Sequence, residues 1–138
     1  MAPITVQTKV RAPLETVWRC WTEPAHITQW CFASADWEAP RAENDVRAGG
    51  RFLTRMAAKD GSVGFDFTGT YTAVEPNTRL SYVMEDGRKV DITFVQTADG
   101  VDVTETFDPE TLNPAEMQRA GWQAILNTFK AHAETCRS

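Results

Sequence analysis

Glu105 is the carboxylate of this sequence that is best placed to do chemistry. Along its predicted strand it alternates in step with Val103 and Phe107, so the three side chains share one face. If that face is the inner one, the carboxylate must be paired or have a raised pKa. Two roles stay open for it: a ligand-facing or acid/base group, and a structural hydrogen-bonding residue. Four arginines are available in the sequence as partners: Arg51, Arg55, Arg88 and Arg119.

Three further side chains are weak catalytic candidates. The hydroxyls of Tyr71 and Tyr82 can each hydrogen-bond a ligand, or the two rings can be core residues whose tips reach a backbone carbonyl. His26 precedes Trp30 by four residues in a predicted short helix. It is interpreted as an exposed or capping histidine, with a general base as the alternative. No spacing joins these residues to Glu105 in a catalytic motif, so no catalytic residue is assigned and turnover is left open.

Metal and cofactor sites are not expected. The two histidines, His26 and His132, are far apart in the chain, and no cysteine or carboxylate stands at ligand spacing from them. The three cysteines, Cys20, Cys31 and Cys136, form no CxxC pair and are interpreted as reduced thiols. The sequence contains no GxGxxG, GxxxxGK[ST] or GxSxG motif. We therefore expect no metal, no cofactor and no nucleophilic serine.

The elements that must position these groups are mostly strands. Residues 3–11 alternate apolar and polar side chains and predict a half-buried strand. A first short helix begins near Pro13, and a second, after Pro24, carries Ile27 and Trp30. Asp-Gly pairs mark three of the turns that follow, which is typical of an antiparallel meander. The strands predicted for this part are residues 35–39, 43–48, 51–58, 62–74, 79–85, 88–97 and 101–107.

A long apolar helix, predicted from Asn113 to about Arg137, closes the chain. Asn113 is expected at the N-cap, Pro114 at the first helical position and Glu116 in a capping box. An apolar stripe follows at helical spacing, made of Met117, Gly121, Trp122, Ala124, Ile125, Leu126, Phe129 and Ala133. One such helix and many strands predict an α+β domain in which a curved antiparallel sheet wraps around the helix.

Strand alternation predicts which side chains face the space between sheet and helix. Phe65, Phe67 and Tyr71 share one face of their strand, and Gly69 makes room among them. Aromatic and methionine side chains suit a flat lipophilic or aromatic ligand, and the alternative is that they simply fill the core. The predicted ligand-binding residues are Trp30, Phe32, Trp37, Phe52, Met56, Phe67, Tyr82, Met84, Phe94, Trp122, Ile125 and Phe129.

Composition excludes several partners. The chain has 138 residues, which we expect to form a single domain spanning residues 1–138, and its net charge is −5. That charge, with no basic stripe, argues against nucleic acid and anionic membranes. No apolar run is long enough to span a membrane, and the N-terminus shows no signal pattern, so we expect a cytoplasmic protein. Pairing of edge strands in a homodimer is compatible with the sequence.

Several segments together resemble a known superfamily. They are APLETVWRCWTEPAHITQW, NDVRAGGRF, FTGTYTAVEPNTRLSY and GWQAIL, in this order. They resemble the SRPBCC (START-like) superfamily, and within it the branch named after the activator of the ninety-kilodalton heat-shock protein ATPase. The segments MAAKDGSVGFDF and VTETFDPE resemble a bacterial subgroup labelled polyketide-cyclase-like. The resemblance implies the helix-grip fold, in which about seven antiparallel strands curl around the C-terminal helix, two short helices follow the first strand, and a deep cavity lies between sheet and long helix.

Three functions are compatible with this resemblance. The favoured one is binding of a small hydrophobic or aromatic molecule in the cavity. The second is an enzyme of polyketide cyclase or hydrolase type that uses the same cavity. Activation of a chaperone ATPase ranks last, because the eukaryotic co-chaperones carry an additional N-terminal domain whereas this sequence begins at its first strand.

Overall fold

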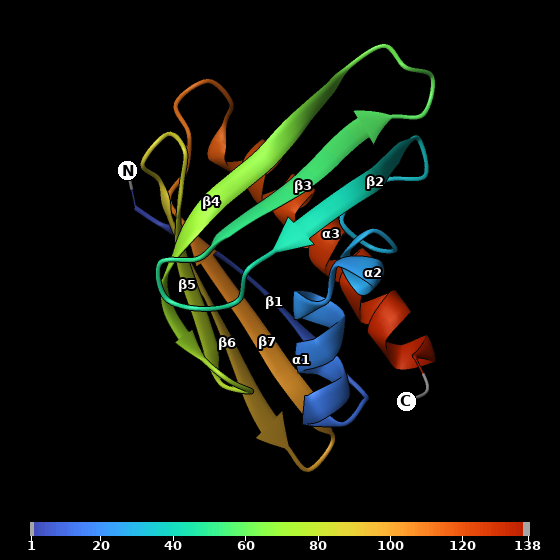
Figure 1. Ribbon diagram of the computed structural model, residues 1–138, viewed down its shortest axis with the longest axis vertical. Coiled ribbons are helices and arrows are strands. Elements are labelled where there is room, and N and C mark those ends of the chain that lie inside the picture. The colour runs from blue at the N-terminus through green and yellow to red at the C-terminus, as the bar shows by residue number, and fades with distance from the viewer. Residues whose placement is uncertain (1, 137–138) are drawn as a thin grey trace.

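The computed structural model describes residues 2–136, which form a curled antiparallel sheet around a long helix (Figure 1). The seven strands are ordered β1-β7-β6-β5-β4-β3-β2 across the sheet. The predicted α+β architecture is therefore confirmed. The strands are β1 (Ile4–Val10), β2 (Trp37–Asn44), β3 (Arg51–Ala58), β4 (Gly64–Glu75), β5 (Arg79–Met84), β6 (Lys89–Thr97) and β7 (Gly100–Phe107). The helices are α1 (Leu14–Thr22), α2 (Pro24–Ile27) and α3 (Ala115–Thr135).

From β2 to β7 each strand pairs with the next along the chain, and β1 pairs with β7. The three Asp-Gly pairs lie in the β3–β4, β5–β6 and β6–β7 hairpins, as predicted. Gly61 and Gly87 have φ values of +79° and +90°. Only glycine adopts this left-handed backbone without steric cost, which is why these turns need it.

The strands predicted at residues 35–39 and 43–48 are wrong as two elements. They form one strand, β2, whose register with β3 shifts between Glu38 and Arg41. Pro40 was interpreted as a break, but β2 is an edge strand that pairs on one side only. An edge strand tolerates a proline, because its missing N–H can fall on the unpaired side or at a bulge.

The start of α3 also differs from the prediction. Pro114, rather than Asn113, is the N-cap residue, and no side chain caps it. Gln118 stabilises the approach to the helix instead: its Nε2 donates to the backbone oxygens of Asn113 (2.8 Å) and Glu110 (3.1 Å). The predicted end near Arg137 lies outside the described residues, and the helix as described ends at Thr135.

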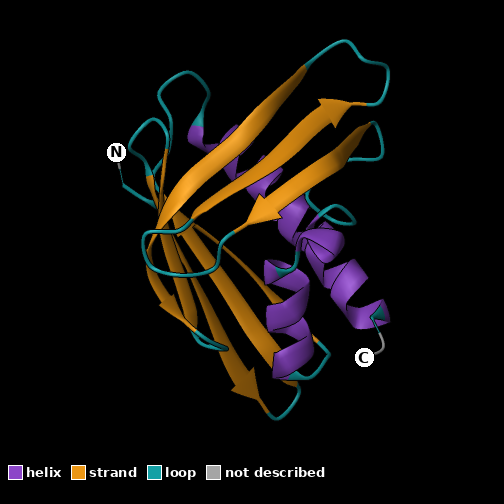
Figure 2. Ribbon diagram, in the orientation of Figure 1, coloured by secondary structure: helices purple, strands orange, loops and turns teal. Residues whose placement is uncertain are grey.

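The long helix lies across the concave side of the sheet, and α1 and α2 lie beside its C-terminal half (Figures 1 and 2). Phe129 and Leu126 are fully buried, whereas Met117 of the predicted stripe is 60% exposed. The apolar stripe is therefore buried only towards the C-terminal half of α3. Within residues 2–136, no helix is both long and apolar enough to cross a membrane.

The predicted second helix is shorter than expected. It ends at Ile27, so Trp30 lies in the turn after it. Trp30 is nevertheless fixed, because its indole Nε1 donates to the backbone oxygen of Cys20 at 2.8 Å. Its ring packs edge-on against Phe129 of α3, with 4.9 Å between centroids.

Candidate functional site

A cavity of about 250 Å³ lies between the concave face of the sheet, the segment around α2 and the long helix. Its lining is dominated by aromatic, aliphatic and sulfur-containing side chains. Eight of the twelve predicted ligand-binding residues line it: Trp30, Phe52, Met56, Phe67, Tyr82, Met84, Trp122 and Ile125. Thr54, Phe65 and Tyr71 also line it, from the strand faces that alternation predicted to point inward. Whether these residues bind a ligand stays a prediction.

Four predicted ligand-binding residues are not among those that line the cavity: Phe32, Trp37, Phe94 and Phe129. Phe94 has the predicted inward direction, but its ring packs against Trp18 and Trp21 of α1 at centroid distances of 5.4 and 5.8 Å. The concave face around Phe94 is thus covered by α1. The cavity lies farther along the face, where α3 contributes Trp122 and Ile125.

Gly69 shapes the cavity wall. A Cβ atom at this position would lie 2.6 Å from the Phe52 ring, so the glycine leaves the room that this ring occupies, as predicted. Phe52 in turn contacts Tyr82 edge-on, with 4.7 Å between centroids. On the opposite side, Trp122 stacks on Phe107 and meets Phe67 edge-on at 6.4 Å. Through these contacts the rings form the walls of the cavity and do not fill it.

Glu105 is the acidic residue of the lining, and it is only 6% exposed. Its strand neighbours in register are Val6 on β1 and Ile92 on β6, both buried and apolar. Within residues 2–136 its carboxyl group has no hydrogen bond or ion pair. Burial raises the pKa of Glu105 to about 8, because the charged form loses its hydration.

The arginines considered as partners of Glu105 are engaged elsewhere. Each forms an ion pair with another carboxylate: Arg51 with Glu85, Arg55 with Asp66, Arg88 with Asp86 and Arg119 with Glu116. Arg88 also lines the cavity, where its Nε donates to Asp86 Oδ2 at 2.8 Å. No described residue therefore hydrogen-bonds Glu105, as the structural role considered for it would require.

The two tyrosines differ in how their hydroxyls are used. The Tyr71 hydroxyl donates to Asn44 Oδ1 at 2.7 Å, and Asn44 Nδ2 donates to the backbone oxygen of Thr22 at 2.7 Å. Its tip thus reaches a side-chain amide rather than the backbone carbonyl considered from sequence. The Tyr82 hydroxyl has no hydrogen bond to the described part of the chain, and burial raises its pKa well above 10. Tyr82 is therefore a neutral phenol facing the cavity.

Sequence reasoning missed four lining residues: Trp21, Ile27, Cys31 and Asn44. Ile27 was recognised as an apolar helix position, but helix periodicity cannot tell which part of the core a helix residue faces, and the same holds for Trp21 on α1. Asn44 falls at the end of β2, beyond the register shift, where strand alternation from residue 37 no longer predicts the face.

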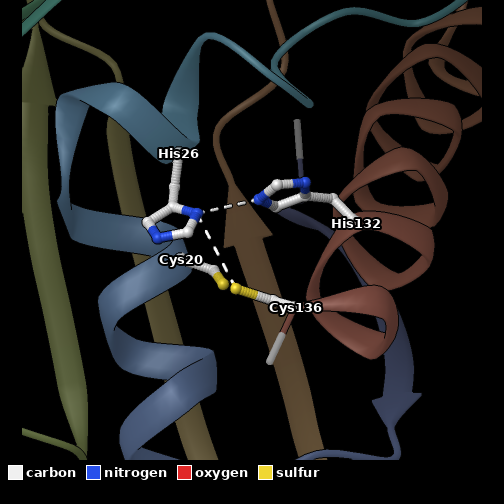
Figure 3. Close-up of side chains that lie close together, drawn as sticks. All are labelled: Cys20, His26, His132 and Cys136. Carbon is white, nitrogen blue, oxygen red and sulfur yellow. Dashed lines mark hydrogen bonds between the residues drawn. The ribbon is translucent and has the colours of Figure 1, made fainter. Parts of the chain in front are cut away.

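His26 does not join Glu105. It belongs to a separate cluster with His132, Cys20 and Cys136, none of which lines the cavity. His26 Nδ1 lies 2.9 Å from His132 Nε2 and 4.0 Å from Cys136 Sγ (Figure 3). The two histidines are far apart in the sequence, but the fold brings the end of α3 against α1 and α2 and places both imidazoles beside two cysteines.

A curled antiparallel sheet that grips a long C-terminal helix, with a cavity in between, defines the helix-grip class of START-like (SRPBCC) proteins, a fold of a ligand-binding kind. Residues 11–134 match the family described as "Activator of Hsp90 ATPase homolog 1-like protein", and the chain belongs to this family. The branch suggested by the sequence segments is thereby confirmed.

Two solved structures share about half of the sequence. The solution structure of an AHSA1-like protein from Aeromonas hydrophila is 48% identical, has a TM-score of 0.91, and is matched over 96% of this chain and 92% of its own. The solution structure of Chr148 from Cytophaga hutchinsonii is 54% identical, with a TM-score of 0.82 and the same two coverages.

A more distant structure, CV1439 from Chromobacterium violaceum, is 23% identical with a TM-score of 0.86. The match covers 97% of this chain and 99% of that chain, and at this identity it supports the fold alone. A search of curated proteins finds no match to this chain.

Proposed function

We propose that this protein binds a small, mostly apolar molecule in the cavity between the sheet and α3, and that Glu105 recognises a hydrogen-bond donor on that molecule. The observation that carries the proposal is the carboxyl group of Glu105, which is 6% exposed, lines the cavity and has no partner among the described residues. Its oxygens are not among the described buried atoms that lack a partner, so they open onto the cavity, where a donor on a ligand can reach them. Such a hydrogen bond inside an apolar lining favours binding.

The lining indicates the chemical class of the ligand. The rings of Phe52, Phe67 and Trp122 offer faces and edges to a flat aromatic or lipophilic molecule. A volume of about 250 Å³ lies just below the usual range of ligand pockets, which starts at about 300 Å³, and this favours a molecule of one or two rings over a long lipid. Tyr82 supplies a second polar contact as a neutral hydroxyl.

The test is a ligand screen by protein-observed NMR, using small phenols, aromatic amides, polyketide-like bicyclic compounds and fatty acids. We expect saturable shifts from donor-bearing aromatic compounds at the Trp30 and Trp122 indole N–H groups. The matched variants are Glu105→Leu and Glu85→Leu, since leucine removes the acceptor at similar size and Glu85 is an exposed carboxylate that does not line the cavity. Glu105→Leu should weaken binding by roughly tenfold or more, and Glu85→Leu should leave it unchanged. Equal affinities in both variants, or no saturable shift with any class, would overturn the proposal.

The second candidate is an enzyme of cyclase or hydrolase type that uses the same cavity. It is favoured by one observation, the pKa of about 8 at Glu105, because a general acid or base works best with a pKa near the ambient pH. Loss of turnover with retained affinity in Glu105→Gln would distinguish chemistry from binding. The family description names activation of a chaperone ATPase, but no feature of the cavity supports this function. It is tested separately, by measuring the activity of that ATPase with and without the protein.

A further inference from the structure

Four potential metal ligands converge at the C-terminal end of α3, away from the cavity. They are the thiols of Cys20 and Cys136 and the imidazoles of His26 and His132 (Figure 3). One ligand atom from each residue can be chosen so that all four lie within 4.8 Å of one another. The cluster is independent of the proposed ligand cavity, because none of these residues lines it.

The donor set is that of a tetrahedral zinc site. Zinc prefers thiolate and imidazole ligands, at about 2.3 Å to sulfur and about 2.0–2.1 Å to nitrogen. A tetrahedron with these bonds has ligand-to-ligand edges of roughly 3.3–3.8 Å. The observed separations fall on both sides of this range: 2.9 Å between His26 Nδ1 and His132 Nε2, and 4.0 Å between His26 Nδ1 and Cys136 Sγ. Small side-chain rotations would bring all four atoms to these bond lengths.

The hydrogen bond between the histidines is compatible with a metal in its place. Two imidazole nitrogens 2.9 Å apart must share one proton, since neither two donors nor two acceptors form such a contact. A cation between the rings would replace that proton. The two thiols would lose their protons to solvent as they become ligands, so binding releases protons.

The four residues come from all three helices. Cys20 lies on α1, His26 on α2, His132 in the last turn of α3, and Cys136 follows as the C-cap. Cys20 is fully buried, and the other three are partly accessible, which leaves an entry path for a cation. A metal here would tie both short helices to the end of the long helix.

We propose that Cys20, His26, His132 and Cys136 bind one zinc ion, or a cation of the same thiophilic divalent class, in a structural site. The role is structural because the four protein ligands complete a tetrahedron, whereas catalytic zinc sites keep one position for water or substrate. Such a site would hold the packing of α1 and α2 against α3.

The experiment uses the full chain, stripped of metal with a chelator and kept reduced, with Co²⁺ as the spectroscopic probe and Zn²⁺ as the competitor. We expect one equivalent of Co²⁺ to produce the intense visible bands of tetrahedral cobalt and a thiolate-to-cobalt charge-transfer band. One equivalent of Zn²⁺ should abolish both bands. Zn²⁺ should also raise the midpoint of thermal unfolding, and more so at higher metal concentration, because it binds the folded state.

The variants Cys136→Ser and His132→Gln each remove one ligand from a partly exposed position, so folding is retained. Removing even an outer partner of a ligand weakens metal sites by about 10- to 100-fold, so each variant should lose at least that much affinity. Cys31→Ala is the matched control, because Cys31 lies in the cavity lining and outside the cluster. It should keep the cobalt bands at full intensity.

Three results would overturn the proposal. One is a reduced protein with titratable thiols that gives no tetrahedral cobalt spectrum. Another is an unchanged spectrum in Cys136→Ser, which would place the metal elsewhere. The third is a protein isolated with a Cys20–Cys136 disulfide that still fails to bind cobalt after reduction, which would make the pair a redox feature rather than a metal site.

Discussion

Trp122 of α3 stacks face to face on Phe107 of β7, with 3.9 Å between ring centroids and 9° between ring planes. Phe107 is fully buried, whereas Trp122 is only partly buried and also lines the cavity. The pair therefore connects the end of strand β7 to the long helix. Trp122 also contributes to one wall of the candidate site.

Replacing Trp122 with Ala should lower the free energy of unfolding by about 2–3 kcal/mol. This lies below the roughly 3–5 kcal/mol of a fully buried tryptophan, because one side of the ring already faces a cavity. Urea denaturation measures the change, and Trp122→Phe, which keeps an aromatic ring on Phe107, should lose less than half as much. A loss below about 0.5 kcal/mol in Trp122→Ala would show that the stack contributes little, as surface substitutions do.

The two cavity tyrosines form a matched pair for a test of hydrogen bonding. Tyr71→Phe removes the donor to Asn44 Oδ1 and should destabilise the protein by about 1 kcal/mol, since the partly buried amide oxygen loses its partner. Tyr82→Phe should change stability by less than about 0.5 kcal/mol, because its hydroxyl has no hydrogen bond within the described chain. Chemical denaturation of both variants measures the difference. Equal losses would contradict this assignment of the two hydroxyls.

Much of the cavity wall could be predicted from the sequence because strand alternation has a period of two. It places Phe52, Met56 and Tyr82 on one face whatever the curvature of the sheet. Alternation cannot tell where along that face the interior is filled. Phe94 was therefore predicted as a ligand contact, although α1 covers it.

The Cys–His cluster could not be predicted for a different reason. His26 and His132 are separated by 106 positions in the sequence, and only the packing of the helices brings them together. Helix periodicity gives the face of each helix but not the register of one helix against another. Ligand spacing within a short segment, the usual signal of a metal site, is therefore absent here.

Gly69 has close neighbours and Gly121 has none, so their alanine variants test the shape of the cavity wall. Gly69→Ala should cost about 1–3 kcal/mol, because the new Cβ would lie 2.6 Å from the Phe52 ring and 3.0 Å from the backbone oxygen of Val83. Gly121→Ala, on α3, meets nothing within 4 Å and should stabilise the helix by about 0.5–1 kcal/mol. Thermal unfolding of the two variants measures the expected loss of stability in Gly69→Ala and the expected gain in Gly121→Ala. If Gly69→Ala is neutral, the Phe52 ring moves freely and the wall is not fixed as described.

The buried carboxyl group of Glu105 should make stability depend on pH. Its pKa is about 8 in the folded protein and 4.5 in a solvated chain, so between these values the folded state binds more protons than the unfolded state. The contribution of Glu105 to the free energy of unfolding is therefore complete below about pH 4.5 and is lost as the pH rises through about 8.

The measurement is the free energy of unfolding of the wild type and of Glu105→Gln, compared at each pH from 5 to about 9. Because glutamine cannot ionise, the difference between the two proteins isolates the titration of Glu105 from that of every other group. Across this window we expect the free energy of unfolding of the wild type to fall, relative to that of the variant, by at most roughly 3–5 kcal/mol. This upper bound corresponds to full burial of the charge. A difference that stays flat with pH would mean that Glu105 is already ionised at pH 5 in the folded state. The cavity would then have to solvate a charged carboxylate, and the ligand expected there would be a cation rather than a neutral hydrogen-bond donor.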